Sequence, residues 1–95
     1  MSDDRVQVLA MGGNVAVTQL AGRAFPDVHI QGDTFANLRQ EVADAARRLR
    51  REPDDGEALD DLDYAVDDMT RMLSFYEAIL AERGIDLPYA RESNS

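Results

Sequence analysis

The sequence predicts an α+β domain of order β-β-β-α-α, in which a three-stranded antiparallel sheet is followed by two helices packed on one of its faces. Two observations predict it. Residues 5–31 hold three short apolar runs separated by glycine, asparagine and proline, and residues 34–83 hold two long segments with apolar residues every three or four positions. We expect residues 1–90 to form a single domain and residues 91–95 a disordered tail.

The first two strands are predicted to form a hairpin over residues 5–20. Val6 and Val8 alternate with Gln7, as in a half-buried strand. The MGGN stretch at 11–14 supplies residues that tolerate the backbone conformation of a tight reversal, and a second apolar run occupies 15–20. The alternation slips near Gln19, which indicates either a bulge or an early strand end.

A third strand and the start of a helix are predicted from the stretch FPDVHIQGDT at 25–34. Pro26 lacks an N–H donor and keeps Phe25 out of helical geometry, so a loop precedes the strand at 28–31. Gly32 permits the turn that follows. Asp33 or Thr34 is the expected cap of the next helix.

That helix is predicted over residues 34–51, and its apolar stripe is expected to face the sheet. Several arginines crowd its last turns, where positive charge is favourable at the negative end of the helix dipole. The stripe consists of Phe35, Leu38, Val42, Ala45 and Leu49.

A longer helix is predicted over residues 57–83, between Pro53 with Gly56 on one side and Gly84 on the other. At 1.5 Å per residue it spans ~40 Å, whereas six-residue strands span only ~20 Å. The helix should therefore extend beyond the sheet and bury its apolar stripe on the first helix, a second copy or another protein. The expected dimer or assembly interface comprises Leu62, Met69, Met72, Tyr76 and Ile79.

Composition restricts the possible partners. The net charge is −9, from 19 acidic residues against 10 basic residues that are all arginine, so nucleic acid is an unfavourable partner and a basic protein a favourable one. The chain has no cysteine, which excludes disulfides and thiolate metal sites. The acidic start MSDDRVQVLA does not resemble a signal peptide, and no window approaches a membrane span, so we expect a cytoplasmic protein without membrane contact.

The acidic residues of the long helix have three interpretations. Asp60, Asp63 and Asp67 lie at helical spacing, but a hard cation needs oxygens that converge from several directions, and the EF-hand register is missing. The remaining two are a solubilising face and a docking surface for a basic protein, in which one strip of charge accelerates encounter. The candidate partner-binding residues are Glu57, Asp60, Asp61, Asp67 and Asp68.

No catalytic constellation or cofactor motif is found. His29 is the single histidine, and no nucleophile motif accompanies it, so an ordinary surface histidine is the better interpretation. Gly12 and Gly13 match neither the phosphate-loop nor the dinucleotide-binding pattern. We therefore expect neither an enzyme nor a bound cofactor.

The stretch FPDVHIQGDTFANLRQEVADAARRL at 25–49 resembles the signature of HicB-like antitoxin domains, in which a strand ends in a Gly-Asp-Thr turn and leads into an alanine-rich helix. ILAERGIDLPY at 79–89 is similar to the segment that closes such domains, and the chain also resembles a small bacterial family of unknown function. The resemblance implies a truncated ribonuclease H-like fold without catalytic acids. It also implies dimerisation and neutralisation of a small basic ribonuclease.

The expected function is a non-enzymatic, antitoxin-like or immunity-like binding module whose acidic long helix contacts a basic protein. The alternative is a structural or adaptor subunit that joins a larger assembly through the apolar stripe of that helix. In both cases we expect a homodimer.

Overall fold

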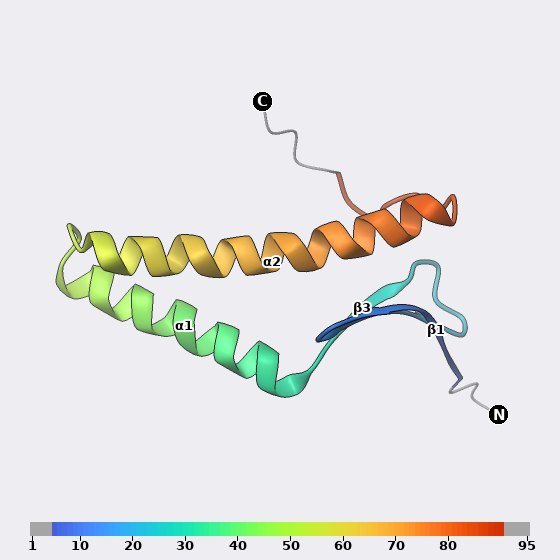
Figure 1. The fold of residues 1–95 in the computed structure, drawn as a ribbon, viewed down its shortest axis with the longest axis horizontal. Helices are drawn as coiled ribbons and strands as arrows, with labels where there is room; N and C mark the ends of the chain where they lie inside the picture. Colours follow the sequence, from blue (N-terminus) through green and yellow to red (C-terminus); the bar gives the residue numbers. More distant parts are fainter. Residues whose placement is uncertain (1–4, 91–95) are drawn as a thin grey trace. The chain divides into compact units, whose positions relative to one another are not determined.

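The computed structural model describes residues 5–90, which form the predicted α+β order of three antiparallel strands followed by two helices (Figure 1). The chain divides into two compact units, one made of Met1–His29 with Ser74–Ser95 and the other of Ile30–Leu73. One helix contributes to both units. The elements are β1 (Val6–Gly12), β2 (Val15–Leu20), β3 (Asp27–Ile30), α1 (Gly32–Arg51) and α2 (Gly56–Glu82).

The sheet has strand order β1-β2-β3, and β1 and β2 form the predicted hairpin. The turn is shorter than expected because β1 continues to Gly12, which leaves only Gly13 and Asn14 between the strands. Gly13 has φ +60, the left-handed conformation that glycine adopts without strain. The pairing register shifts between Val8 and Ala10, so the bulge lies in β1 rather than at Gln19.

The bulge determines which β1 side chains face the core. Val17 pairs with Ala10 and is fully buried, whereas Val6 and Val8 are 51% and 54% exposed. The alternation of Val6 and Val8 therefore identifies a strand correctly. It does not identify the buried face, because the extra residue, Leu9, interrupts the alternation and itself packs against the core.

The core of the sheet unit forms between β2 and the C-terminal part of α2. Val17, Tyr76 and Leu80 are its buried centre. The Tyr76 hydroxyl donates a 2.7 Å hydrogen bond to the carbonyl of buried Pro26, which fixes the chain where β3 begins. Burial, with a smaller effect of the Asp27 carboxylate, raises the pKa of Tyr76 above its usual 10.0, so the phenol stays protonated as a donor.

The segment after α2 packs on the same core. Gly84 has φ +68, and the Ile85 N–H bonds the Leu80 carbonyl at 2.9 Å, so α2 ends in a Schellman motif as the glycine predicted. Ile85 and Leu87 form no strand and instead pack against the core cluster. Tyr89 stacks on Tyr76 with ring centroids 6.5 Å apart. The predicted disordered tail at 91–95 lies outside the described residues.

The start of α1 differs from the prediction. The helix begins at Gly32, and its N-cap is Gln31, which makes no side-chain capping bond. Asp33 and Thr34 already lie inside the first turn, so neither is the cap. Asp33 nevertheless contributes there, because its carboxylate accepts a 2.8 Å bond from the Thr34 N–H at the positive end of the helix dipole.

Gly12 gives a test of the packing between β1 and α2. A Cβ on Gly12 would lie 3.0 Å from the Phe75 ring, whereas a Cβ on Gly32 would meet nothing within 4 Å. We expect Gly12→Ala to lower the free energy of unfolding by about 1 kcal/mol. The control Gly32→Ala should raise it by about 0.5 kcal/mol, because alanine restricts the unfolded chain. Urea unfolding measures both, and equal effects would contradict the packing described.

Candidate protein-interaction surfaces

The helical unit is held together mainly by alanines. Ala45 on α1 and Ala58 and Ala65 on α2 are 1%, 0% and 0% exposed, and Leu38 is also buried. Alanine lets two helix backbones approach closely, but it removes little apolar surface from water. The contact between the helices is therefore close and contributes only a small core.

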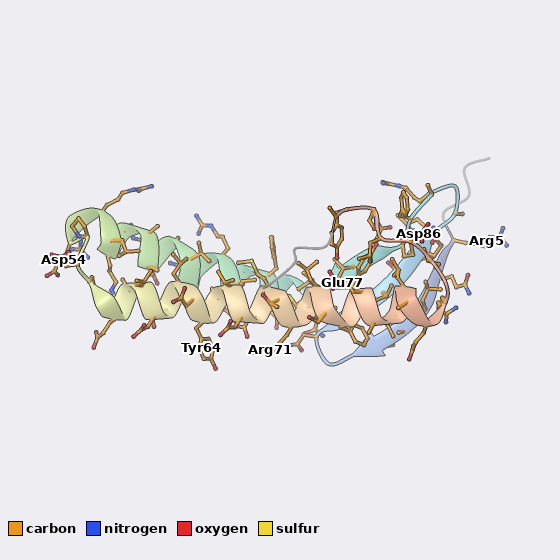
Figure 2. The ribbon with its side chains drawn as sticks, turned by 90° about the horizontal axis from the view of Figure 1, so that it is seen from above. Arg5, Asp54, Tyr64, Arg71, Glu77 and Asp86 are labelled. Atoms are coloured by element: carbon orange, nitrogen blue, oxygen red, sulfur yellow. The ribbon has the colours of Figure 1, made fainter. Side chains whose placement is uncertain are left out.

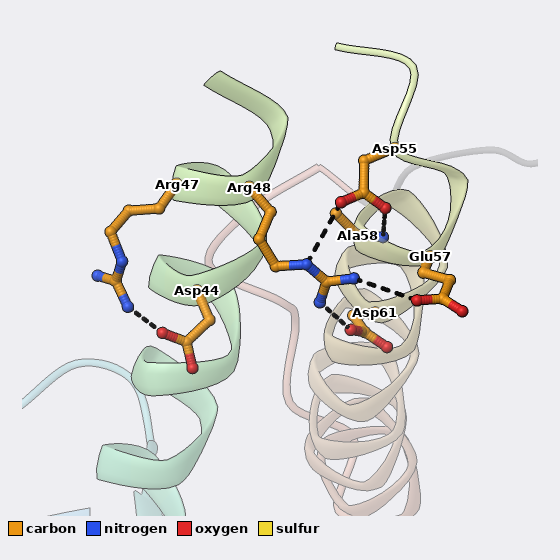
Figure 3. A network of polar contacts seen from close by, with 7 residues as sticks. All are labelled: Asp44, Arg47, Arg48, Asp55, Glu57, Ala58 and Asp61. Carbon is orange, nitrogen blue, oxygen red and sulfur yellow. Dashed lines mark hydrogen bonds and ion pairs between the residues drawn. The ribbon is translucent and has the colours of Figure 1, made fainter. Parts of the chain in front are cut away.

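One side of this helical hairpin is polar and is organised by Arg48 (Figure 3). Its guanidinium contacts Asp61 at 2.8 Å, Asp55 at 3.4 Å and Glu57 at 3.7 Å. Tyr64, which projects from α2 in the same direction as Arg71 (Figure 2), also lines this side, so the "polar side" comprises Glu41, Asp44, Arg48, Asp61 and Tyr64.

Asp55 joins this network to the start of α2. Its carboxylate accepts a 3.0 Å hydrogen bond from the Ala58 N–H, which makes Asp55 the N-cap of the helix. That bond, followed by the nearby Arg48 charge, holds the pKa of Asp55 below its usual 3.8. The sequence contained this signal in EPDDG, but it did not distinguish Asp54 from Asp55.

Helical geometry shows which residues share the opposite side. Arg48 and Asp61 each lie three residues after a buried alanine, Ala45 and Ala58, and their side chains meet. A step of three residues rotates about −60° and a step of four about +40°. Residues that lie four after buried positions must therefore point to the other side on both helices.

These residues are apolar. Four of them lie four positions after a buried residue: Val42 and Leu49 on α1, and Leu62 and Met69 on α2. Helical rotation places the other apolar residues of this side next to these four. Five members are well exposed: Phe35 59%, Leu59 50%, Val66 49%, Leu73 44% and Met69 38%. We call this surface the "apolar side": Phe35, Val42, Leu49, Leu59, Leu62, Val66, Met69 and Leu73.

The five predicted partner-binding acids are not equivalent. Asp61 is paired with Arg48, Asp68 with Arg71, and Glu57 contacts Arg48 only at long range while its side chain stays 93% exposed. Asp60 and Asp67 are exposed and make no ion pair within residues 5–90.

Asp63 resembles them and points the same way, although the sequence did not separate it from the paired acids. Within the described chain, no three carboxylate or imidazole groups are arranged to hold a metal ion.

The five residues of the predicted dimer or assembly interface also fall into two groups, buried and accessible. Tyr76 is 4% exposed and Ile79 packs against the same core, so both contact the sheet unit of their own chain. The expectation that Tyr76 faces a partner is therefore corrected. Met69 stays accessible, and Leu62 and Met72 are half-buried. The sequence pattern had also placed Val66 and Leu73 on the apolar stripe of this helix, but not Leu59. Leu59 and Val66 each lie one position after a buried alanine.

The edge strand β1 also has exposed apolar side chains. The register places Val6, Val8 and Met11 on the face of the sheet opposite to Val17, and Met11 is 76% exposed, whereas Thr18 and Ala16 on the same face of β2 are buried. His29 is exposed on β3. None of the helices within residues 5–90 has the length and apolar content needed to cross a bilayer.

The chain belongs to DUF6959, a family of unknown function whose model matches residues 1–89. No curated protein and no solved structure matches it. The interaction surfaces therefore have to be interpreted from their own chemistry.

The Asp55 cap predicts a specific pH dependence. Because its folded pKa is lowered, Asp55 contributes stability above its unfolded pKa of 3.8, and this contribution is lost as the pH falls through the folded value. Asparagine can also cap a helix but cannot titrate. We expect the urea midpoint of Asp55→Asn to fall less steeply than that of the wild type between about pH 5 and about pH 3. Asp54→Asn is the matched control and should retain the wild-type slope; equal slopes in all three proteins would contradict the assignment.

Proposed function

We propose that this protein is a non-enzymatic, cytoplasmic binding module that docks on a basic protein through the outward face of α2. The observation that carries the proposal is a row of carboxylates without counter-ions. Asp60, Asp63 and Asp67 lie within about 60° of one another around the helix and are exposed, and none has an ion-pair partner within the described chain.

The arginines nearby do not neutralise this row. Arg48 forms ion pairs with Asp55 and Asp61, and Arg71 forms one with Asp68. The paired acids and the unpaired acids of α2 therefore lie on different sides of the helix. With a net charge of −9, the whole chain attracts cations, and this row is where that attraction is not compensated locally. A partner with a cluster of arginine or lysine side chains is the complementary surface.

The resemblance of residues 25–49 to HicB-like antitoxin domains favours an antitoxin-like or immunity-like role within this proposal. An acidic row of this kind can occupy a site on a basic ribonuclease that is meant for phosphates. The partner would then be a small basic toxin, which this protein neutralises by covering its active site.

The alternative is a structural or adaptor subunit that assembles through an apolar surface. The exposure of Leu59, Val66 and Leu73 favours it, because these side chains form one line along α2. Met69→Asp would abolish partner binding in that case, whereas neutralising the acidic row would not.

The test compares two variants with the same net charge. In Asp60→Asn/Asp63→Asn/Asp67→Asn the proposed row is neutral, whereas Glu41→Gln/Asp44→Asn/Glu52→Gln removes three charges elsewhere; both change the net charge from −9 to −6. The partner is identified by cross-linking in the native host, purified and titrated. We expect the first variant to reduce the association rate at least about tenfold at low salt, and the control much less.

Two further results bear on the proposal. Co-expression should suppress the toxicity of the basic partner, and the row variant should suppress it less than the control. Equal rates for both variants, or an acidic partner, would exclude docking through this face.

A further inference from the structure

We propose that the apolar side of the helical hairpin is the contact surface of a homodimer, in which two hairpins pack face to face as an antiparallel four-helix bundle. This inference uses the side of α2 that carries Leu59 and Val66, and Asp63, at the edge of that side, is the one residue that it shares with the acidic row. The occupant is a second copy of this chain.

The first argument is the distribution of side-chain size. Between α1 and α2 the fully buried residues are Ala45, Ala58 and Ala65, and the largest fully buried side chains, Leu80 and Val17, belong to the sheet unit. Leu38, at 8% exposed, is the large side chain buried with them, and most other large apolar residues of the hairpin lie on its apolar side. A two-helix unit buries most of its apolar surface only when another layer covers that side.

The second argument is area. The five well-exposed residues of the apolar side present on the order of 400 Å², if a fully exposed large apolar side chain has about 170 Å². A standard interface buries about 800 Å² per partner, of which about 57% is apolar, or roughly 450 Å². The apolar side alone therefore supplies nearly the apolar surface that a stable dimer needs.

The third argument is charge, and it selects a second copy over an unrelated partner. Arg39 and Arg50 lie at the outer edge of the apolar side on α1, one position after Leu38 and Leu49. Asp63, one position after Leu62, lies at the outer edge on α2. All three are exposed, and none makes an ion pair within residues 5–90. One edge is therefore basic and the other acidic.

A two-fold axis parallel to the helices brings these edges together. It places α1 of one copy against α2 of the other, so each basic edge meets an acidic edge and neighbouring helices are antiparallel. A two-fold axis across the helices would instead place α1 on α1 and α2 on α2, with like charges facing. The charges thus favour the first arrangement.

The test is the molecular mass in solution, measured by light scattering and sedimentation over a range of micromolar concentrations. The wild type should be a dimer. Val66→Asp should make it monomeric with unchanged helix content by circular dichroism. Tyr64→Asp is the matched control, since Tyr64 is 66% exposed on the same helix but lies on the polar side, and it should remain dimeric. If Val66→Asp unfolds, Val66→Gln takes its place and should raise the dimer dissociation constant.

The charged edges are tested separately. Arg39→Glu/Arg50→Glu should raise the dimer dissociation constant roughly tenfold at low salt, and Asp63→Arg should raise it too. Mixing these two variants should restore association, because both edges are then complementary again. A wild type that is monomeric throughout, with its apolar side left for another protein, would overturn the proposal. So would a dimer lost through Tyr64→Asp but kept in the Val66 variants.

Discussion

The structure depends on a single constraint: α2 is one continuous helix whose two ends pack on different surfaces. At 27 residues it spans about 40 Å, whereas strands of four to seven residues span at most about 24 Å. Its C-terminal part supplies Tyr76 and Leu80 to the sheet core, and its N-terminal part supplies Ala58 and Ala65 to the contact with α1. The chain therefore forms two compact units that share a helix, each with a small core.

The order of the five elements could be predicted because periodicity and glycine positions are local properties of the chain. Gly84 is an example, since it alone could end α2 in the left-handed conformation. Helix starts are less predictable, because a cap depends on one hydrogen bond that several adjacent polar residues could make. Asp55 caps α2, and the acidic Asp33 does not cap α1. The position of the bulge at Leu9 could not be predicted from the sequence of β1 either, because it depends on the pairing with β2.

The candidate site could be predicted only by residue type. The apolar residues of α2 follow one periodic pattern, yet Tyr76 is buried in its own chain while Val66 is exposed, because different segments cover different parts of the helix. The acidic residues of α2 fall into paired and unpaired groups for the same reason. Asp61 meets Arg48, 13 residues earlier in the chain, whereas Asp60 beside it points away from α1. Which acids are paired depends on where α1 lies, and composition does not contain that information.

The two proposed surfaces are compatible in one assembly. Face-to-face packing of the hairpins buries Leu59 and Val66 between the copies and leaves Asp60 and Asp67 pointing outward on each. Two chains of net charge −9 repel one another, which opposes association but strengthens the field that attracts a cationic protein. In the proposed dimer, Arg39 and Arg50 would meet Asp63 of the other copy and place opposite charges where the chains are closest, so Asp60 and Asp67 would remain for a basic partner. Repulsion is thus reduced at the contact and retained on the outer face, where a basic partner would bind.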